Sequence, residues 1–308
     1  MFWEKKNKEN GNGQNAGGLH ETAAPININV VVKTDVGNIR TNNEDSASFY
    51  RNGNEQILRE KGYLLIVADG MGGHQAGEVA SKMAVEIISE EYFKPTKEIN
   101  KEKILSAAFN TANKKIYEQA STNELHRGMG TTSTALVVLA NTIYFAHSGD
   151  SRAYLYKNKT IIKLTEDHTY VQQLVNNGDI SSEQADTHPQ RNILTNAMGT
   201  KPTLRVDTGK CQVSFDENDR LLLCSDGLYD YLTDAELAQV MDTASLQDAA
   251  DHFINEAKKR GGKDNITVVL AERIEERPAG VLKITRESEL LKMTRDAELP
   301  TGINMTES

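Results

Sequence analysis

The chain has 308 residues, of which 38% are hydrophobic and 26% charged, which fits a globular protein with a sizeable core. Its formal net charge of -9 argues against a nucleic-acid partner, because nucleic acids bind basic surfaces. No apolar run approaches the ~20 residues of a membrane-spanning helix, and residues 1–18 lack the apolar middle of a signal peptide. We therefore expect a cytoplasmic protein with no membrane partner.

Both cysteines, Cys211 and Cys224, lie in apolar, strand-like stretches outside any C-x-x-C motif. We expect buried free thiols rather than a disulfide, which suits a reducing compartment.

The N-terminal part of the chain predicts a tail followed by strands. Residues 1–24 are polar and glycine-rich, and we expect a disordered tail. Alternating polarity over residues 26–32 predicts a strand with one buried face. A short strand over residues 47–50 leads to the turn pair Asn52-Gly53, and the apolar run 64–68 predicts a buried strand.

Two long helices come next, over residues 76–92 and about 101–120, where apolar residues recur every four positions. Short strands then follow one another closely, at 132–139, 142–147, 152–156 and 160–164. Their connections are too short for parallel crossovers, so we expect an antiparallel meander.

Residues 167–198 interrupt the strands with short helical patterns. One ends at Gly178, one begins with the capping box Ser181 to Gln184, and a third covers 193–198. Such an insertion is typical either of a flap beside a site or of a structural connector.

The remaining elements return to strands and helices. We expect strands at 203–207, 210–215, 221–224 and 266–271, with helices at 233–241 and 246–260. The order of elements predicts an α+β domain over residues 25–274, with two antiparallel sheets packed together and helices outside. Residues 275–308 read as a partly disordered tail with one weak helical stretch, 287–299.

Four aspartates stand beside turns at predicted strand ends: Asp45, Asp69, Asp226 and Asp264. Each alone would be an ordinary turn residue, but together they suggest an oxygen-ligand site for Mg²⁺ or Mn²⁺ rather than Zn²⁺. Several carboxylates can hold two ions that activate a water, a chemistry suited to phosphoester hydrolysis. Arg40 is placed to bind the phosphate, unless it is an ordinary surface arginine.

Other catalytic motifs are weak. The chain lacks a G-x-S-x-G elbow and a G-x-x-x-x-G-K-[ST] loop. His74, His147 and His168 are each either catalytic or, as is commoner for such positions, structural.

Seven motifs together resemble the PPM family of metal-dependent protein phosphatases, the type 2C Ser/Thr phosphatases. They occur in family order and cover roughly residues 29–272, at positions 40–45, 67–74, 128–132, 148–152, 164–168, 225–228 and 262–267.

This resemblance implies a four-layer α-β-β-α sandwich with a dinuclear Mn²⁺/Mg²⁺ centre. The implied metal ligands are Asp45, Asp69, the backbone carbonyl of Gly70, Asp226 and Asp264, while Arg40 holds the phosphate and Glu44 supports the ligands. Asp150 matches a position that helps Asp226 bind a third ion in bacterial members.

Met71 stands where animal members carry a histidine proposed as the general acid, so a water or His168 is left for that role. The chain resembles bacterial members at this position.

The resemblance predicts a protein serine/threonine phosphatase that hydrolyses phosphoserine and phosphothreonine with an activated water and no covalent phosphoenzyme. Its expected partners are phosphorylated proteins, the substrates of a Ser/Thr kinase, and we expect a monomer. One alternative is an inactive, phosphate-sensing module of the same fold, although that loss usually removes a ligand and all are present here. The other is an enzyme for small phosphoesters.

Overall fold

The computed structural model describes residues 26–72, 76–243 and 245–274. The two expected tails, the helical stretch 287–299 and His74 lie outside these residues, so the predictions for them and for the domain boundaries stay predictions.

Eleven strands in the described part form two antiparallel sheets. The five-stranded sheet runs in the order β1 (Asn27–Asp35), β11 (Ile266–Ile274), β10 (Arg220–Cys224), β7 (Arg152–Lys157) and β8 (Thr160–Lys163). The six-stranded sheet runs in the order β2 (Asp45–Tyr50), β3 (Tyr63–Met71), β5 (Ser133–Leu139), β6 (Thr142–Ser148) and β9 (Asp207–Lys210), with β4 (Gly130–Thr131) paired to β3.

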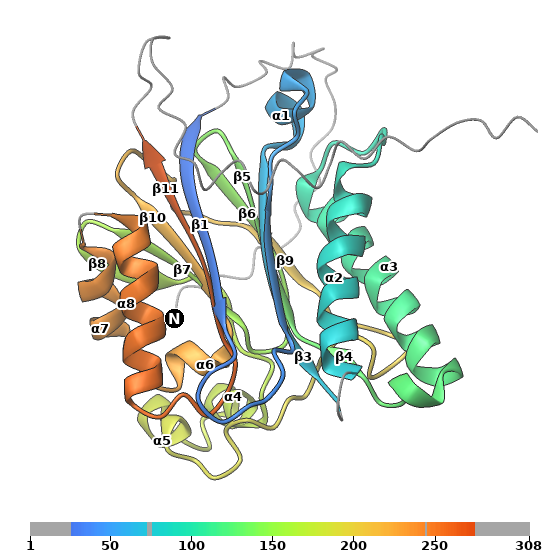
Figure 1. Ribbon diagram of the computed structural model, residues 1–308. Helices are drawn as coiled ribbons and strands as arrows, with labels where there is room; N and C mark the ends of the chain where they lie inside the picture. Colours follow the sequence, from blue (N-terminus) through green and yellow to red (C-terminus); the bar gives the residue numbers. More distant parts are fainter. Residues whose placement is uncertain (1–25, 73–75, 244, 275–308) are drawn as a thin grey trace, which may run out of the picture. The chain divides into compact units, whose positions relative to one another are not determined.

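The sheets pack face to face between two pairs of helices (Figure 1). The outer face of the six-stranded sheet is covered by α2 (Ala76–Phe93) and α3 (Lys101–Thr122). The outer face of the five-stranded sheet is covered by α7 (Asp234–Met241) and α8 (Leu246–Lys259). The predicted four-layer α-β-β-α sandwich is confirmed.

The β3 sequence is apolar on both sides because both of its faces are buried. Leu64 and Ile66 pack with the helices α2 and α3, whereas Leu65 and Val67 pack into the core between the sheets. All four side chains are fully buried.

The expected meander is wrong. β5 pairs with β6 in one sheet and β7 pairs with β8 in the other, so the chain changes sheets between Ser148 and Arg152. Gly149 makes this short crossing with a φ of 113°, which favours glycine. Connection length predicts antiparallel neighbours, but it does not say whether successive hairpins share a sheet.

Two further strand predictions and one helix prediction are wrong. Residues 203–206 and 211–215 form no strand, and β9 occupies the segment between them. The segment 193–198 forms no helix, and two of its residues make isolated bridges, Leu194 to Thr169 and Met198 to Thr131. These segments find their hydrogen-bond partners in distant parts of the chain, which overrides their local pattern.

Two short α-helices, α1 (Glu55–Lys61) and α6 (Asp226–Tyr229), and the 3-10 helix η1 (Glu124–His126) were not predicted. Asn54 caps α1 by accepting hydrogen bonds from the backbone N–H groups of Gln56 and Ile57. The turn pair Asn52-Gly53 predicts a simple connection between two strands, but α1 lies in this connection.

The predicted capping signals of the flap are confirmed. Gly178 ends α4 (Tyr170–Asn177) in the left-handed conformation, and Ser181 with Gln184 forms the capping box of α5 (Ser182–Asp186). Thr233 and Glu236 form the same box at α7. Cys211 and Cys224 are free thiols, of which Cys224 is buried and Cys211 half-buried. Within the described residues, no helix is long and apolar enough to cross a membrane.

The core between the sheets gives a direct test of the fold. Leu223 is fully buried there, and we expect Leu223→Ala to lower the free energy of unfolding by about 2–5 kcal/mol, because it removes buried methyl groups and leaves a cavity. Leu125→Ala is the matched control, since Leu125 is 85% exposed and its loss should change stability by less than about 0.5 kcal/mol. Urea denaturation of both variants measures the difference, and equal stabilities would contradict the assigned core.

Candidate metal centre

Asp45 and Asp69 lie side by side at one end of the six-stranded sheet. Asp45 is the first residue of β2, and its antiparallel partner on β3 is Asp69. The burial of β2 and β3 fixes this register, since a one-residue slip would turn the aspartates to the other face.

Asp226 and Asp264 come from the corresponding end of the five-stranded sheet. Asp226 follows the end of β10 and begins α6, while Asp264 lies two residues before β11. Ser225 joins the two sheets here: its hydroxyl donates to Asp45 Oδ2 at 2.7 Å and accepts from the backbone N–H of Thr267 at 3.1 Å. The four predicted carboxylates are therefore gathered at one end of the sandwich.

Asp150 reaches the same region through the crossing between the sheets, and only 6% of the residue is exposed. Its charge is felt at both Asp69 and Asp226, where it raises the pKa of each carboxyl. The change of sheet that the meander prediction missed is thus the feature that brings Asp150 to the site.

Burial raises the carboxyl pKa values of Asp45, Asp69, Asp150 and Asp226. It raises the pKa of Asp45 to about 6, and together with the charge of Asp167 it raises that of Asp150 to about 7. Burial and the charges of neighbouring aspartates hold the pKa values of Asp69 and Asp226 well above the ordinary range. A positive charge at this place would reverse all these shifts.

Gly70 occupies a position with no room for a side chain. A Cβ there would stand 2.2 Å from the carbonyl oxygen of Gly77 and 2.5 Å from that of Glu44. The N–H of Gly70 donates to the Glu44 carbonyl at 3.1 Å, so the backbone beside Asp69 is held tightly against the strand that begins at Asp45.

Arg40 lies at the mouth of the site. Its Nη2 donates to Asp264 Oδ2 at 2.7 Å, and 49% of its side chain is exposed. The hydrogen bond from Arg40 to Asp264 raises the pKa of Arg40, so the guanidinium stays charged. The Asp264 carboxylate thus orients the Arg40 guanidinium, which has further N–H donors for a ligand.

Asn265 is a site residue whose role the sequence did not reveal. Its side-chain amide donates to the carbonyls of Val36 and Asn42, both at 3.0 Å, and accepts from the N–H of Glu44 at 2.7 Å. These bonds fix the loop that carries Arg40 against the start of β11. The clue in the sequence was the place of this Asn between Asp264 and an apolar strand. The residue is buried there, and a buried amide must have hydrogen-bond partners.

His147 and His168 make contacts that support structural roles. Burial lowers the pKa of His147 to about 3, so the ring is neutral, and its Nε2 donates to the Glu166 carbonyl at 3.0 Å. His168 accepts the Gly149 N–H at Nδ1 and donates from Nε2 to Asp207 at 3.0 Å. With both nitrogens occupied, His168 is not free to protonate a leaving group.

The donor set fits a divalent cation. Asp226 Oδ1 is buried without a hydrogen-bond partner, which is costly unless something else binds it. Among the described residues, no three His, Cys, Asp or Glu side chains are set closely enough to hold an ion by themselves. A site for Mg²⁺ or Mn²⁺ is compatible with this arrangement, because Mg²⁺ is commonly held by one or two carboxylates and keeps several waters.

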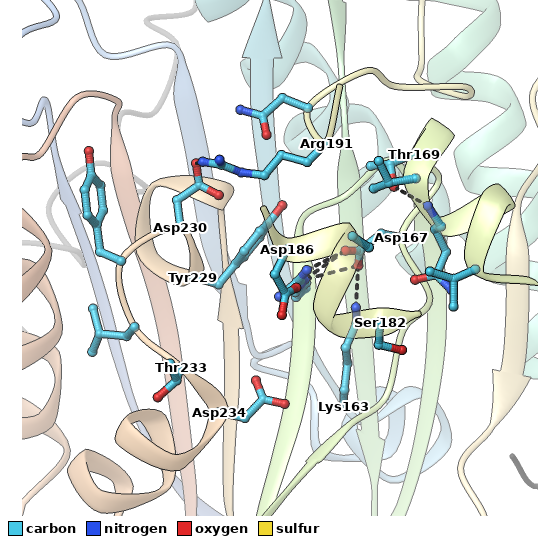
Figure 2. A pocket seen from close by; sticks show the side chains of 18 residues that line it. Lys163, Asp167, Thr169, Ser182, Asp186, Arg191, Tyr229, Asp230, Thr233 and Asp234 are labelled. Atoms are coloured by element: carbon cyan, nitrogen blue, oxygen red, sulfur yellow. Dashed lines mark hydrogen bonds and ion pairs between the residues drawn. The ribbon is translucent and has the colours of Figure 1, made fainter. Parts of the chain in front are cut away.

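A cavity of about 460 Å³ opens beside these carboxylates. Asp226 lines it from the start of α6, Lys263 and Asp264 line it from the loop before β11, and Arg191 and Asn192 line it from the flap. A second cavity, of about 680 Å³, shares Arg191 with it and extends between α4, α5 and α7 (Figure 2). The segment 167–198 therefore borders the site as the flap alternative predicted.

Known proteins share the sequence and the four-layer sandwich of this chain. The chain matches the family model "Protein phosphatase 2C" over residues 30–174. It is 41% identical to the serine/threonine phosphatase Stp of Listeria innocua, over 78% of this chain and 94% of that relative. The chain therefore belongs to the protein phosphatase 2C family, as the motifs indicated.

Solved structures agree with this membership. The serine/threonine phosphatase Stp1 of Staphylococcus aureus is 34% identical and superposes with a TM-score of 0.74, over 84% of this chain and all of that chain. The catalytic domain of PstP in complex with two manganese ions is 32% identical, with a TM-score of 0.67, over 80% of this chain and 99% of that chain.

The raised carboxyl pKa values predict how the stability of the metal-free protein depends on pH. The folded protein keeps protons that the unfolded chain has lost above about pH 4. This protonation stabilises the fold at low pH, and the contribution is lost as the pH rises through the folded values of about 6 for Asp45 and about 7 for Asp150. We expect Asp150→Asn to be more stable than the parent at pH 8 by about 1–3 kcal/mol, with a smaller gain at pH 5.

Chemical denaturation in the presence of a chelator measures this effect. Asp179→Asn is the control, because Asp179 is exposed on the flap. Two results would contradict the repulsion between the buried carboxylates. One is a parent protein whose stability does not fall between pH 5 and pH 8, and the other is an Asp150→Asn variant that is less stable than the parent at pH 8.

Proposed function

We propose that the protein hydrolyses phosphoserine and phosphothreonine in other proteins, using two divalent cations, Mn²⁺ or Mg²⁺. The observation that carries this proposal is the group of buried carboxylates, including the unpartnered Asp226 Oδ1, in a chain of the protein phosphatase 2C family. Asp45, Asp69, Asp226, Asp264 and the carbonyl of Gly70 would hold the two ions, and Asp150 with Asp226 a possible third. Two such ions, when bound, would neutralise the phosphate and lower the pKa of the attacking water.

Arg40 would bind the phosphate. Asp264 engages one nitrogen of its guanidinium, and a planar guanidinium can offer its other N–H groups to two phosphate oxygens at once. Half of the side chain is exposed, so a phosphate on the surface of another protein can reach it. This accessibility is compatible with a protein substrate.

The reaction would use water as the nucleophile and form no covalent phosphoenzyme. Met71 cannot donate a proton, and both nitrogens of His168 are engaged. A water molecule would therefore protonate the leaving serine or threonine oxygen. We further propose that the substrates are products of a Ser/Thr kinase and that the enzyme acts as a cytoplasmic monomer.

Hydrolysis of a phosphothreonine peptide tests the metal requirement. We expect turnover with Mn²⁺ or Mg²⁺ and none with a chelator. Asp45→Asn and Asp264→Asn should each abolish turnover while the protein stays folded, whereas Asp179→Asn should keep it. Turnover in chelator or in either site variant would refute the site. A folded, metal-binding protein without turnover would favour the phosphate-sensing alternative, and preference for free phosphoserine would favour small phosphoesters.

Arg40→Ala tests the phosphate-binding role. If Arg40 binds the phosphate equally in the ground and transition states, KM should rise, by about tenfold or more, while kcat changes less. Steady-state kinetics on the same peptide measure both constants. Arg51→Ala, at an exposed arginine beyond β2, should leave both unchanged. An unchanged KM in Arg40→Ala would remove this role from Arg40.

A further inference from the structure

The guanidinium of Arg152 joins three elements beside the candidate metal centre. Arg152 begins β7, and its Nη2 and Nε donate to Asp167 Oδ2 at 2.7 and 3.0 Å. Its Cζ lies 3.6 Å from the centre of the Tyr229 ring. Asp167 is the first residue of the flap and Tyr229 the last residue of α6, so one side chain bonds to the flap and stacks on the helix.

This contact is buried and charged. The Arg152 side chain is 20% exposed and that of Asp167 only 7%. Lys163 adds a second cation, with Nζ 2.8 Å from Asp167 Oδ1 (Figure 2). Burial favours the neutral acid, but the charges of Arg152 and Lys163 outweigh it and lower the pKa of Asp167. The arginine is thus held in place by a carboxylate that stays ionised.

The helix α6 depends on such contacts for its position. It has four residues, and Ser225 makes no side-chain capping bond to it. A helix this short is not stable by itself in water. Asp226 is its first residue, so the position of that carboxylate follows the position of the helix. At Gly227, α6 packs so closely on the Asn265 carbonyl that a Cβ would lie 2.0 Å from it.

We propose that Arg152 is a positioning residue: by stacking on Tyr229 while it binds Asp167, it fixes α6 against the base of the flap and so places the Asp226 carboxylate. Only arginine can do both, because its flat guanidinium stacks on a ring and its fork binds a carboxylate, whereas lysine offers a single point charge. The effect on metal binding rests on the proposed function, but the effect on α6 does not.

Hydrogen exchange on the metal-free protein tests the placement of α6 directly. The N–H groups of Asp230, Tyr231 and Leu232 bond to carbonyls within α6. In Arg152→Lys and in Tyr229→Leu we expect these amides to exchange about tenfold faster, while the amides of β10 stay protected. Tyr229→Phe keeps the aromatic face and should exchange like the parent. The double variant Arg152→Lys/Tyr229→Leu should be no faster than either single variant, because both remove the same contact.

Calorimetry with Mn²⁺ gives the second measurement. Residues that orient metal ligands typically change affinity by roughly 10- to 100-fold, so we expect at least a tenfold weaker site in Arg152→Lys and Tyr229→Leu. Arg220→Lys is the matched control. Arg220 is also buried and paired, with Glu272 at 2.7 Å, but it begins β10, at the opposite end of that strand from Asp226. The Arg220→Lys variant should be less stable than the parent, but the exchange of the α6 amides and the affinity for Mn²⁺ should not change.

Unchanged exchange of the α6 amides, or an additive double variant, would overturn the inference whatever the activity. If Arg152→Lys does not fold, Tyr229→Leu alone decides, because it leaves the pair of Arg152 and Asp167 intact. The parent protein could fail to hydrolyse the peptide while its variants still show faster exchange of the α6 amides. That result would count against the proposed function, but the placement of α6 by Arg152 would stand.

Discussion

The candidate site depends on the burial of several like charges where the two sheets end together. Burial raises the pKa values of Asp45, Asp69, Asp150 and Asp226, and the charges of neighbouring aspartates add to the rise, so ionising these carboxyls costs free energy. A rigid sandwich can impose this arrangement because many apolar contacts between its layers outweigh one local repulsion. Divalent cations bound among these carboxylates would replace the repulsion with attraction, so the same geometry that is costly without cations would favour their binding.

The network around the carboxylates explains why they keep their places. Ser225 ties Asp45 to β11, and Asn265 ties the Arg40 loop to the same strand. Each bond joins segments more than 40 residues apart, so the site is a property of the packed sandwich rather than of any one motif. Arg40 lies on the exposed side of the site, where Asp264 orients its guanidinium, and in the proposed function it would bind the phosphate.

The flap is built into the same framework. Its first residues are held through Asp167 on one side and His168 on the other, where His168 bonds to Gly149, next to Asp150. Asn196, near the end of the flap, donates to the His168 ring as well as to Ser148. The base of the flap is therefore anchored to the crossing between the sheets. This gives Arg152 and Tyr229 a fixed surface against which α6 is held.

The sequence by itself determined the fold class and the family, and it predicted the aspartates of the candidate site. The spacing of apolar residues, the capping boxes and the glycine turns are local signals, and they located α2, α3, α7, α8 and most strands. The strand-end aspartates were also visible, because a carboxylate next to a buried strand and a glycine is a local pattern. The roles of these residues remain a proposal.

Only the tertiary structure decided which strands share a sheet, and with it what lies beside each carboxylate. The hairpins β5–β6 and β7–β8 look alike in sequence, yet they join different sheets, and the crossing between them carries Asp150. The same holds for Asn265, Arg152 and Tyr229, whose partners lie up to 229 positions away in the chain. Local patterns record how one segment folds, whereas hydrogen bonds and stacking between distant segments arise only when packing brings those segments together.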